Sequence, residues 1–368
     1  MQRILPTLAA LSALCGCGDE LPPIEKVVEH RLLSAPVHVV GPYDPENVPD
    51  DRIRAQAMPG ETVEVLPFAV GPEGVVDPDT LDLRWIVCEL FPGRGDFACI
   101  LESFPTSLDR MPACNFPTVN DVLAAGEPIA IETPCLLDAG TSPTFDVPVS
   151  EGTLSGADLE LTAIGSTPGG TSTERCAREL LSGQANVPND CIYGVQTVSV
   201  GPKLRLLDWL VQLGFDLGDL EAPDPEEIDE PDLHPVITSF RVSVLDDDGE
   251  PTGEATEVPI GGEFEAEPGQ RLRIDTTSPE DDLQEYRIPI NGGASFEDGI
   301  EEYTGQWFIT WGGLLSPISL DAESYNEWTL TAEGDDASSP PDGLAHLYYV
   351  VRDGRNGSAS WSFSVRVR

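Results

Sequence analysis

Basic residues are scarce in this sequence. Lys and Arg together number 20, against 65 Asp and Glu, and only Lys26 and Lys203 are lysines. The formal net charge at pH 7 is therefore −45. A surface this acidic repels the phosphates of nucleic acids and of anionic lipid headgroups. We therefore expect no nucleic-acid partner and no attraction to lipid headgroups.

The sequence also lacks the short motifs of several common catalytic sites. It contains no HExxH, no GxxxxGK[ST] and no GxSxG, which are typical of zinc proteases, phosphate-binding loops and serine hydrolases. The four histidines lie in unrelated contexts, so we expect none of them to act as a catalytic base. Glycosidases need only two carboxylates. A chain with 65 acidic residues always contains such a pair, so the presence of a pair indicates nothing. A hydrolase built on scattered carboxylates is therefore the weaker alternative to a non-catalytic protein.

The apolar run at the amino terminus is too short for a membrane-spanning helix, which needs about 20 apolar residues. The run extends from Ile4 to Leu14, follows the basic residue Arg3 and contains only three interruptions. A short apolar run behind a basic residue is typical of a secretory signal peptide. We therefore expect residues 1–16 to direct export and to be removed.

The signal segment ends in the sequence LCGC, which resembles the lipobox of bacterial lipoproteins. Leu14 is aliphatic, Cys15 and Gly16 are small, and Cys17 takes the acceptor position. The resemblance implies cleavage before Cys17 and a diacylglycerol on its sulfur, which would tie the protein to a membrane. Because Gly18 rather than an aspartate follows Cys17, it also implies the outer membrane. The alternative is a plain secreted protein in which these cysteines carry no lipid.

Six further cysteines follow in the expected exported chain. An even number of cysteines without a CxxC pair indicates disulfides rather than a zinc site. Six cysteines allow 15 connectivities, and proximity in the sequence favours Cys176 with Cys191 and Cys88 with Cys99. The six are Cys88, Cys99, Cys114, Cys135, Cys176 and Cys191.

Strand patterns occur in the same order in both halves. A Pro-Gly turn followed by alternating apolar residues opens the segments 59–70 and 268–278, and a second strand pattern follows each of them, at 83–90 and 283–290. The last nine residues, SWSFSVRVR, alternate strictly between apolar and polar side chains, which predicts a half-buried strand. The whole chain is therefore predicted to be all-β.

The carboxyl-terminal sequence YYVVRDGRNGSASWSFSVRV resembles the immunoglobulin-like repeats of the polycystic-kidney-disease (PKD) and cadherin-like type in bacterial surface proteins. The resemblance covers about the last third of the chain and concerns the fold only. Applied to both halves, it implies two immunoglobulin-like β-sandwiches at 36–202 and 236–368. Such repeats act as spacers or as binding modules.

Two connecting segments complete the predicted organisation. Residues 17–35 have little apolar pattern, which indicates a stalk between lipid and first domain. Leu204, Leu207, Leu210 and Val211 lie at helical spacing, so the connection 203–235 is predicted to begin with a short helix that covers the seam between the domains. A helix that lies on the membrane is the alternative. The acidic, proline-rich part of the connection is predicted to be a linker that buries nothing.

Acidic turns in the second half offer the oxygen ligands that calcium prefers. The alternative is that the same residues lie in solvent-exposed hairpin turns that bind no ion, and no EF-hand spacing is present. Apart from calcium and the lipid, no cofactor is expected. The candidate calcium ligands are Asp246, Asp248, Glu250, Asp281 and Asp282.

The tryptophans of the second half, Trp307, Trp311, Trp328 and Trp361, allow two interpretations. Exposed, they would form a stacking platform for sugars. Alternation with polar residues favours the core instead.

Taken together, these patterns predict a lipid-anchored, non-catalytic envelope protein that contacts an envelope or surface protein or a polysaccharide. A calcium-dependent or carbohydrate-binding adhesin is the alternative.

Overall fold

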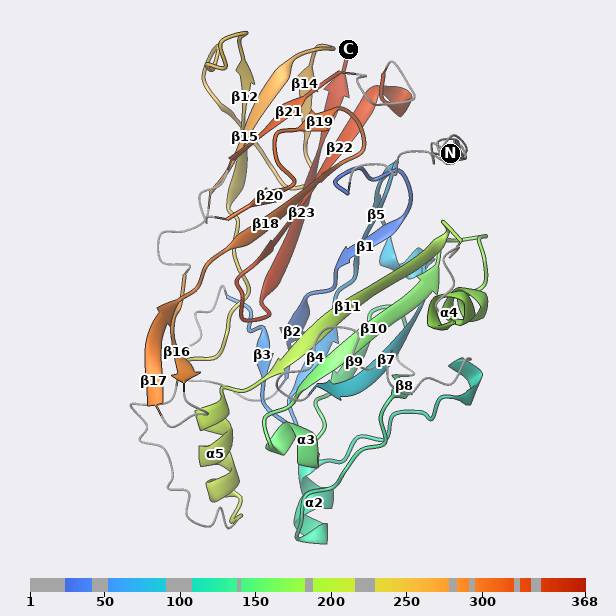
Figure 1. The fold of residues 1–368 in the computed structure, drawn as a ribbon, viewed down its shortest axis with the longest axis vertical. Helices are drawn as coiled ribbons and strands as arrows, with labels where there is room; N and C mark the ends of the chain where they lie inside the picture. Colours follow the sequence, from blue (N-terminus) through green and yellow to red (C-terminus); the bar gives the residue numbers. More distant parts are fainter. Residues whose placement is uncertain are drawn as a thin grey trace, which may run out of the picture.

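The chain is built mainly of β-strands that form several sheets (Figure 1), which confirms the predicted all-β class. A computed structural model describes residues 24–41, 52–90, 108–137, 140–182, 188–215, 229–277, 283–290, 295–320, 325–331 and 339–368. Within these ranges the first half contains one five-stranded and two three-stranded sheets, and the second half two five-stranded sheets and a two-stranded ribbon.

The five-stranded sheet of the first half has the strand order β3-β11-β10-β7-β8. Its strands pair antiparallel except for β3, which runs parallel to β11. The predicted strand at 83–90 is its central strand β7. The bounds are β3 (Gln56–Ala57), β7 (Asp82–Leu90), β8 (Cys135–Leu137), β10 (Asp158–Ser166) and β11 (Cys191–Val200).

Two three-stranded sheets complete the first half, and the strand pattern predicted at 59–70 supplies a strand to each. One contains β1 (Arg31–Ser34), β5 (Phe68–Gly71) and β6 (Gly74–Val76), and the other β2 (Val37–Val39), β4 (Thr62–Val65) and β9 (Thr144–Asp146). Apolar side chains of all three sheets form one core around Trp85, Leu159 and Leu161. These three side chains are fully buried because apolar side chains of the two smaller sheets pack over the central strands.

Four short helices lie in the described part of the first half and the connection: α2 (Val119–Ala125), α3 (Glu151–Leu154), α4 (Thr173–Leu181) and α5 (Lys203–Gln212). Helix α5 is the helix predicted from the leucine spacing, but its buried face agrees with the prediction only at Leu210, and its partner is the first half rather than the seam. Leu206 and Leu210 are its buried residues, and they pack with Met58, Val149 and other apolar side chains of the first half. Val211 is 40% exposed.

Two disulfides staple the first half. Cys176–Cys191, which proximity predicted, joins α4 to β11, and Cys114–Cys135 joins β8 to the segment before α2. Cys88 is disulfide-bonded as well. Its predicted partner Cys99 lies outside the described residues.

Two five-stranded sheets face each other in the second half, with orders β13-β12-β15-β21-β19 and β14-β23-β22-β18-β20. All four tryptophans and the apolar face of the last strand belong to the core between them, which confirms the core interpretation. The bounds are β12 (Ser239–Leu245), β13 (Thr256–Val258), β14 (Glu263–Ala266), β15 (Arg271–Thr277), β18 (Thr304–Ile309), β19 (Gly313–Leu314), β20 (Ile318–Ser319), β21 (Tyr325–Thr329), β22 (Leu344–Arg352) and β23 (Ser358–Val367).

The strand pattern at 283–290 forms a separate two-stranded ribbon. Strand β16 (Glu285–Ile290) pairs antiparallel with β17 (Ser295–Ile300), outside both large sheets of the second half. In Figure 1 the ribbon extends alongside the first half, near α5. The ribbon therefore lies beside the junction of the two halves.

Both predicted connecting segments are folded where the structure describes them. The described part of the expected stalk is folded: residues 31–34 form β1, and Val27 is 1% exposed. In the acidic linker Asp232 and His234 are 0% and 5% exposed, so the expectation that this segment buries nothing is wrong. Both segments are buried because they lie between the halves, where the backbone of each segment is hydrogen-bonded on both sides.

Candidate functional site

The junction between the halves is closed by buried polar contacts. Tyr348 on β22 donates its hydroxyl to the Gly71 carbonyl of the first half at 2.8 Å, in an apolar cluster with Val27 and Val70. The Val27 N–H donates to the Ile309 carbonyl at 2.9 Å. Because such donors and acceptors are costly to leave unpaired, the two halves hold each other in place.

The segment 231–235 is hydrogen-bonded to both halves. On the side of the first half, the Asp232 carbonyl accepts from the Ala55 N–H at 2.8 Å, and the His234 N–H donates to the Ile53 carbonyl at 2.8 Å. On the side of the second half, the Leu233 N–H donates to the side-chain carbonyl of Gln284 at 2.8 Å. The segment predicted as a free linker is therefore a structural part of the junction.

Both ring nitrogens of His234 are hydrogen-bonded to backbone groups. Its Nδ1 accepts from the Ser358 backbone N–H at 3.0 Å, so its Nε2 carries the proton and donates to the Val37 carbonyl at 2.8 Å. Burial, first of all, and the nearby His38 lower the pKa of His234 to about 4. His38 lies with its ring 4.8 Å from that of His234, so these two histidines, unrelated in sequence, meet in the fold.

Three carboxylates form a buried cluster next to this segment. Asp232 precedes β12, Glu301 follows β17 and Asp353 follows β22, and they are 0%, 2% and 2% exposed. One oxygen of each lies within 4.8 Å of the others. We refer to Asp232, Glu301 and Asp353 as the acidic cluster.

Backbone N–H groups fix each carboxylate of the acidic cluster by one oxygen. Gly357 donates to Asp232 Oδ2 at 3.2 Å, Gln284 to Glu301 Oε2 at 3.1 Å and Arg355 to Asp353 Oδ1 at 2.8 Å. The second oxygens of Asp232 and Asp353 are buried and accept from no fixed donor among the described residues. Asp232 Oδ1 and Asp353 Oδ2 are therefore desolvated oxygens that lack a hydrogen-bond donor in the described part of the chain, although Asp232 Oδ1 lies in an ion pair with Arg355.

Arg355 is the cation of the acidic cluster. Its Nη1 donates to Glu301 Oε1 at 3.0 Å, whereas its Nε lies 3.8 Å from Asp232 Oδ1, which is an ion pair without a hydrogen bond. The guanidinium also covers the ring of Tyr286, 4.8 Å from its centroid. One guanidinium thus faces three carboxylates.

The pKa values of all three carboxyl groups are raised to about 7. Burial is the largest cause in each case, because it penalises the charged form. Repulsion from a neighbouring carboxylate adds to it: Asp353 acts on Asp232, Asp232 on Glu301, and Glu301 on Asp353. Arg355 lowers all three pKa values by less than burial raises them. Burial and mutual repulsion therefore favour the protonated form of these three carboxyl groups more than water does.

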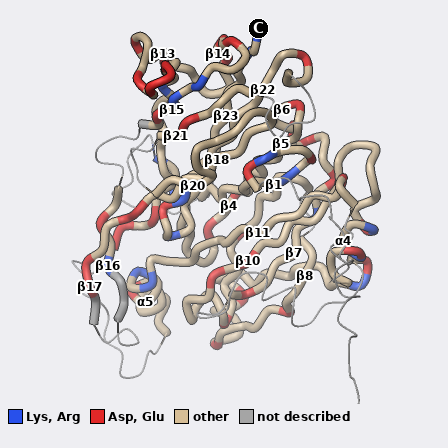
Figure 2. Tube along the Cα trace, turned by 45° about the horizontal axis from the view of Figure 1, so that its top comes forward, with Lys and Arg blue, Asp and Glu red and all other residues tan. Residues whose placement is uncertain are grey.

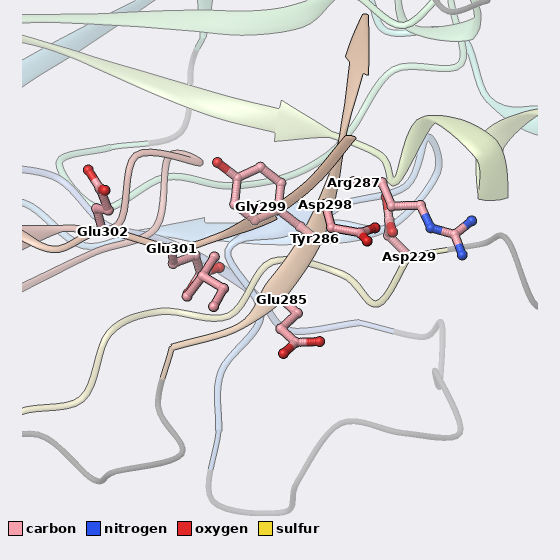
Figure 3. Close-up of a pocket in the computed structure, with 9 residues that line it drawn as sticks. Asp229, Glu285, Tyr286, Arg287, Asp298, Gly299, Glu301 and Glu302 are labelled. Carbon is pink, nitrogen blue, oxygen red and sulfur yellow. The ribbon is translucent and has the colours of Figure 1, made fainter. Parts of the chain in front are cut away.

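An acidic groove of about 770 Å³ opens beside the acidic cluster, along β16 and β17. Glu301 belongs to both the groove and the cluster, while Glu302, Glu285 and Asp298 extend the groove away from it (Figure 3). Arg287 is the basic residue of this lining. Figure 2 shows the acidic residues along the two strands of the ribbon. The groove would attract cations rather than anions.

The candidate calcium ligands that the structure describes, Asp246, Asp248 and Glu250, do not join this cluster. Asp246 Oδ1 accepts from the N–H groups of Asp248 and Glu250, both at 2.9 Å, so its carboxylate closes its own exposed turn. Among the described residues, the group of carboxylates that converges on one point is the acidic cluster. Asp281 and Asp282 lie outside the described residues, as does the lipidation candidate Cys17.

Sequence reasoning missed the acidic cluster because its members come from three distant segments. Asp353 stands in the turn sequence DGRNG, where it reads as a hairpin residue, and Asp232 stands in the supposed linker. A Cβ on Gly357 would lie 1.8 Å from Asp353 Oδ2, so the close approach requires glycine. Leu233, an apolar residue beside Asp232 in this acidic segment, was the signal available in the sequence that the segment packs.

None of the helices in the described part of the chain combines the length and hydropathy needed to cross a bilayer. No family model and no curated protein matches the chain. Among solved structures, the chain is similar to dimeric latent PorU from Porphyromonas gingivalis at 13% identity and a TM-score of 0.20. That match covers 93% of this chain and 24% of the PorU chain, so this chain spans about a quarter of its length.

Proposed function

We propose that this chain is a lipid-anchored, non-catalytic protein of the bacterial outer membrane, whose two immunoglobulin-like β-sandwiches at 36–202 and 236–368 act as one structural or interaction module. The observation that carries the proposal is the junction. Segment 231–235 is buried and bonded to both halves. A rigid pair of sandwiches suits a spacer or a docking surface, because partner binding then costs little ordering.

The absence of a catalytic role is supported by how the buried ionisable groups are used. Both ring nitrogens of His234 are bonded to backbone groups, and the acidic cluster has no nucleophile beside it among the residues that form its contacts. The partner we propose is an envelope or surface protein or a polysaccharide. Nucleic acid is unsuitable because of the net charge of −45.

The anchor is tested by Cys17→Ser in the full chain. Without the thiol no diacylglycerol can be attached, and a single unanchored chain this acidic has no attraction for anionic membranes. We expect most of the protein to move from the membrane fraction to the soluble fraction, measured by fractionation and palmitate labelling. Cys15→Ser is the matched control and should stay on the membrane, because Cys15 leaves with the signal peptide. Membrane association of Cys17→Ser equal to that of wild type would contradict the anchor.

The closed junction is tested by Tyr348→Phe. At pH 7 the variant loses the hydrogen bond to Gly71, so we expect the free energy of unfolding to fall by about 1 kcal/mol. Burial raises the pKa of Tyr348 above its ordinary value of 10. The folded state therefore keeps a proton that the unfolded chain releases above pH 10, and this group's stabilisation is present below pH 10 and declines as the pH rises.

Phenylalanine does not titrate, so wild type should lose its advantage over Tyr348→Phe above pH 10, at up to about 1.4 kcal/mol per pH unit. Urea denaturation of both proteins from pH 7 to 11 measures the difference, in which the other tyrosines cancel. Parallel curves over the whole range would mean that Tyr348 is accessible to water and that the junction is open.

A further inference from the structure

The acidic cluster has the composition of a divalent-cation site. Three carboxylates carry three negative charges when ionised, and Arg355 supplies one positive charge. Two negative charges remain in a place that is almost fully buried. Buried charge without compensation is very costly, and one divalent cation compensates two charges.

The oxygens of the acidic cluster are also prepared for an ion. Each carboxylate is fixed by a backbone N–H through one oxygen, and the second oxygens of Asp232 and Asp353 have no hydrogen-bond donor among the described residues. Oxygens without a donor in a buried site are rare in folded proteins. A cation is the partner that satisfies two such oxygens at once, because it binds lone pairs without supplying a proton.

From this geometry we infer that Asp232, Glu301 and Asp353 bind one calcium ion, which fixes segment 231–235 to the second half of the molecule. Hard carboxylate oxygens without nitrogen or sulfur select calcium or magnesium over transition metals. Calcium holds its ligands at about 2.3–2.6 Å, so two oxygens that contact one ion are up to about 5 Å apart. The three ligand oxygens lie within 4.8 Å of one another, a separation that one calcium ion can span.

The acidic groove provides the access route and supplies the ion. Glu301 lies at the boundary between groove and cluster, and the other acidic residues of the lining raise the local cation concentration. Waters from the groove complete the coordination number of 6 to 8 that calcium requires.

The consequence of calcium binding is a firmer junction. Asp232 offers its side chain to the cluster while its carbonyl accepts from the Ala55 N–H of the first half. An ion on the Asp232 carboxylate therefore stabilises the segment that joins the halves, and with it their relative position. This inference does not depend on the lipid anchor, so its failure leaves the Cys17 test unaffected.

The test uses the purified full chain, stripped with chelator and titrated with CaCl₂ in a calorimeter. We expect one site with a Kd of about 10⁻⁴ to 10⁻³ M, as in extracellular calcium modules. At 10 mM calcium the Tm should rise by about 3 to 5 °C, and MgCl₂ should give a smaller shift. A wild-type protein that takes up no calcium overturns the inference.

Asp353→Asn locates the ion, with Asp248→Asn as the matched control in an exposed turn. Asp353→Asn should bind calcium at least about ten-fold more weakly, yet in chelator it should melt no lower than wild type, because one repelling buried charge is gone. Asp248→Asn should bind as wild type does. Glu301→Gln gives the same comparison if Asp353→Asn does not fold. Equal calcium affinity in wild type and cluster variant, or loss of binding in Asp248→Asn, overturns the assignment.

Discussion

Arg355→Met is expected to lower the free energy of unfolding by about 3 to 5 kcal/mol in the presence of chelator at pH 7, since breaking a buried ion pair from one side leaves uncompensated charge. The Arg355 side chain is 12% exposed and is ion-paired with Glu301 and Asp232, whose side chains are 1% and 0% exposed. Methionine keeps the length of the apolar stem and removes the charge. Urea denaturation followed by tryptophan fluorescence measures the change.

Arg355→Lys is the matched control for this variant. Lysine keeps the positive charge but not the planar group that donates to Glu301 and covers the Tyr286 ring. We therefore expect a smaller loss than for Arg355→Met. Calcium should recover part of the stability of Arg355→Met, because the ion replaces missing positive charge. A loss below about 1 kcal/mol, the range of surface pairs, would show that the cluster is hydrated and that Arg355 is not its counter-ion.

The strands could be predicted because their signal is local. In the last strand Trp361, Phe363, Val365 and Val367 alternate with polar residues, and all four are buried in β23. A period of two directs every second side chain to one face, whatever the rest of the chain does. The spacing of the leucines in α5 is a local signal as well, so the helix could be predicted. Its buried face could be predicted only in part, because the leucines at 204, 206, 207 and 210 surround much of the helix and only the tertiary packing selects Leu206 and Leu210.

The acidic cluster could not be predicted because acidic residues are common in this chain and their local sequence does not indicate where they lie in the fold. Asp232 and Asp246 both stand in acidic, turn-rich sequence. One is buried at the junction and the other closes an exposed turn. What separates them is the chain that covers Asp232, namely the backbone near Ala55 on one side and Gly357 on the other. Such long-range contacts depend on topology, which a single sequence does not state.

The same limit applies to the disulfides. Cys176 and Cys191 lie close in the sequence, so proximity identified the pair, whereas Cys114 and Cys135 are joined because β8 brings Cys135 beside the segment before α2. Both halves of the molecule thus combine locally encoded strands with contacts that topology alone supplies. The junction, which holds the candidate functional site, consists almost entirely of contacts of the second kind.

Trp307→Ala is the second variant with a large expected effect, and it separates a core tryptophan from a sugar-stacking one. Trp307 is fully buried, lies 4.1 Å from the Tyr349 ring between centroids, and donates its Nε1 hydrogen to Ser319 Oγ at 3.0 Å. Truncating a tryptophan in a packed core costs about 3 to 5 kcal/mol, because the apolar contacts are lost and a cavity remains. We expect a loss of that size in urea denaturation.

Tyr325→Ala is the control for Trp307→Ala in the same half. Tyr325 is 49% exposed and lies under the Arg273 guanidinium at 4.2 Å, so its removal should cost only about 1 kcal/mol. An aromatic ring can stack on a sugar only if its face is open, which Trp307 does not offer and Tyr325 does in part. A loss below about 1 kcal/mol for Trp307→Ala would mean that its ring is not in the core, and the carbohydrate-binding alternative would then regain its platform.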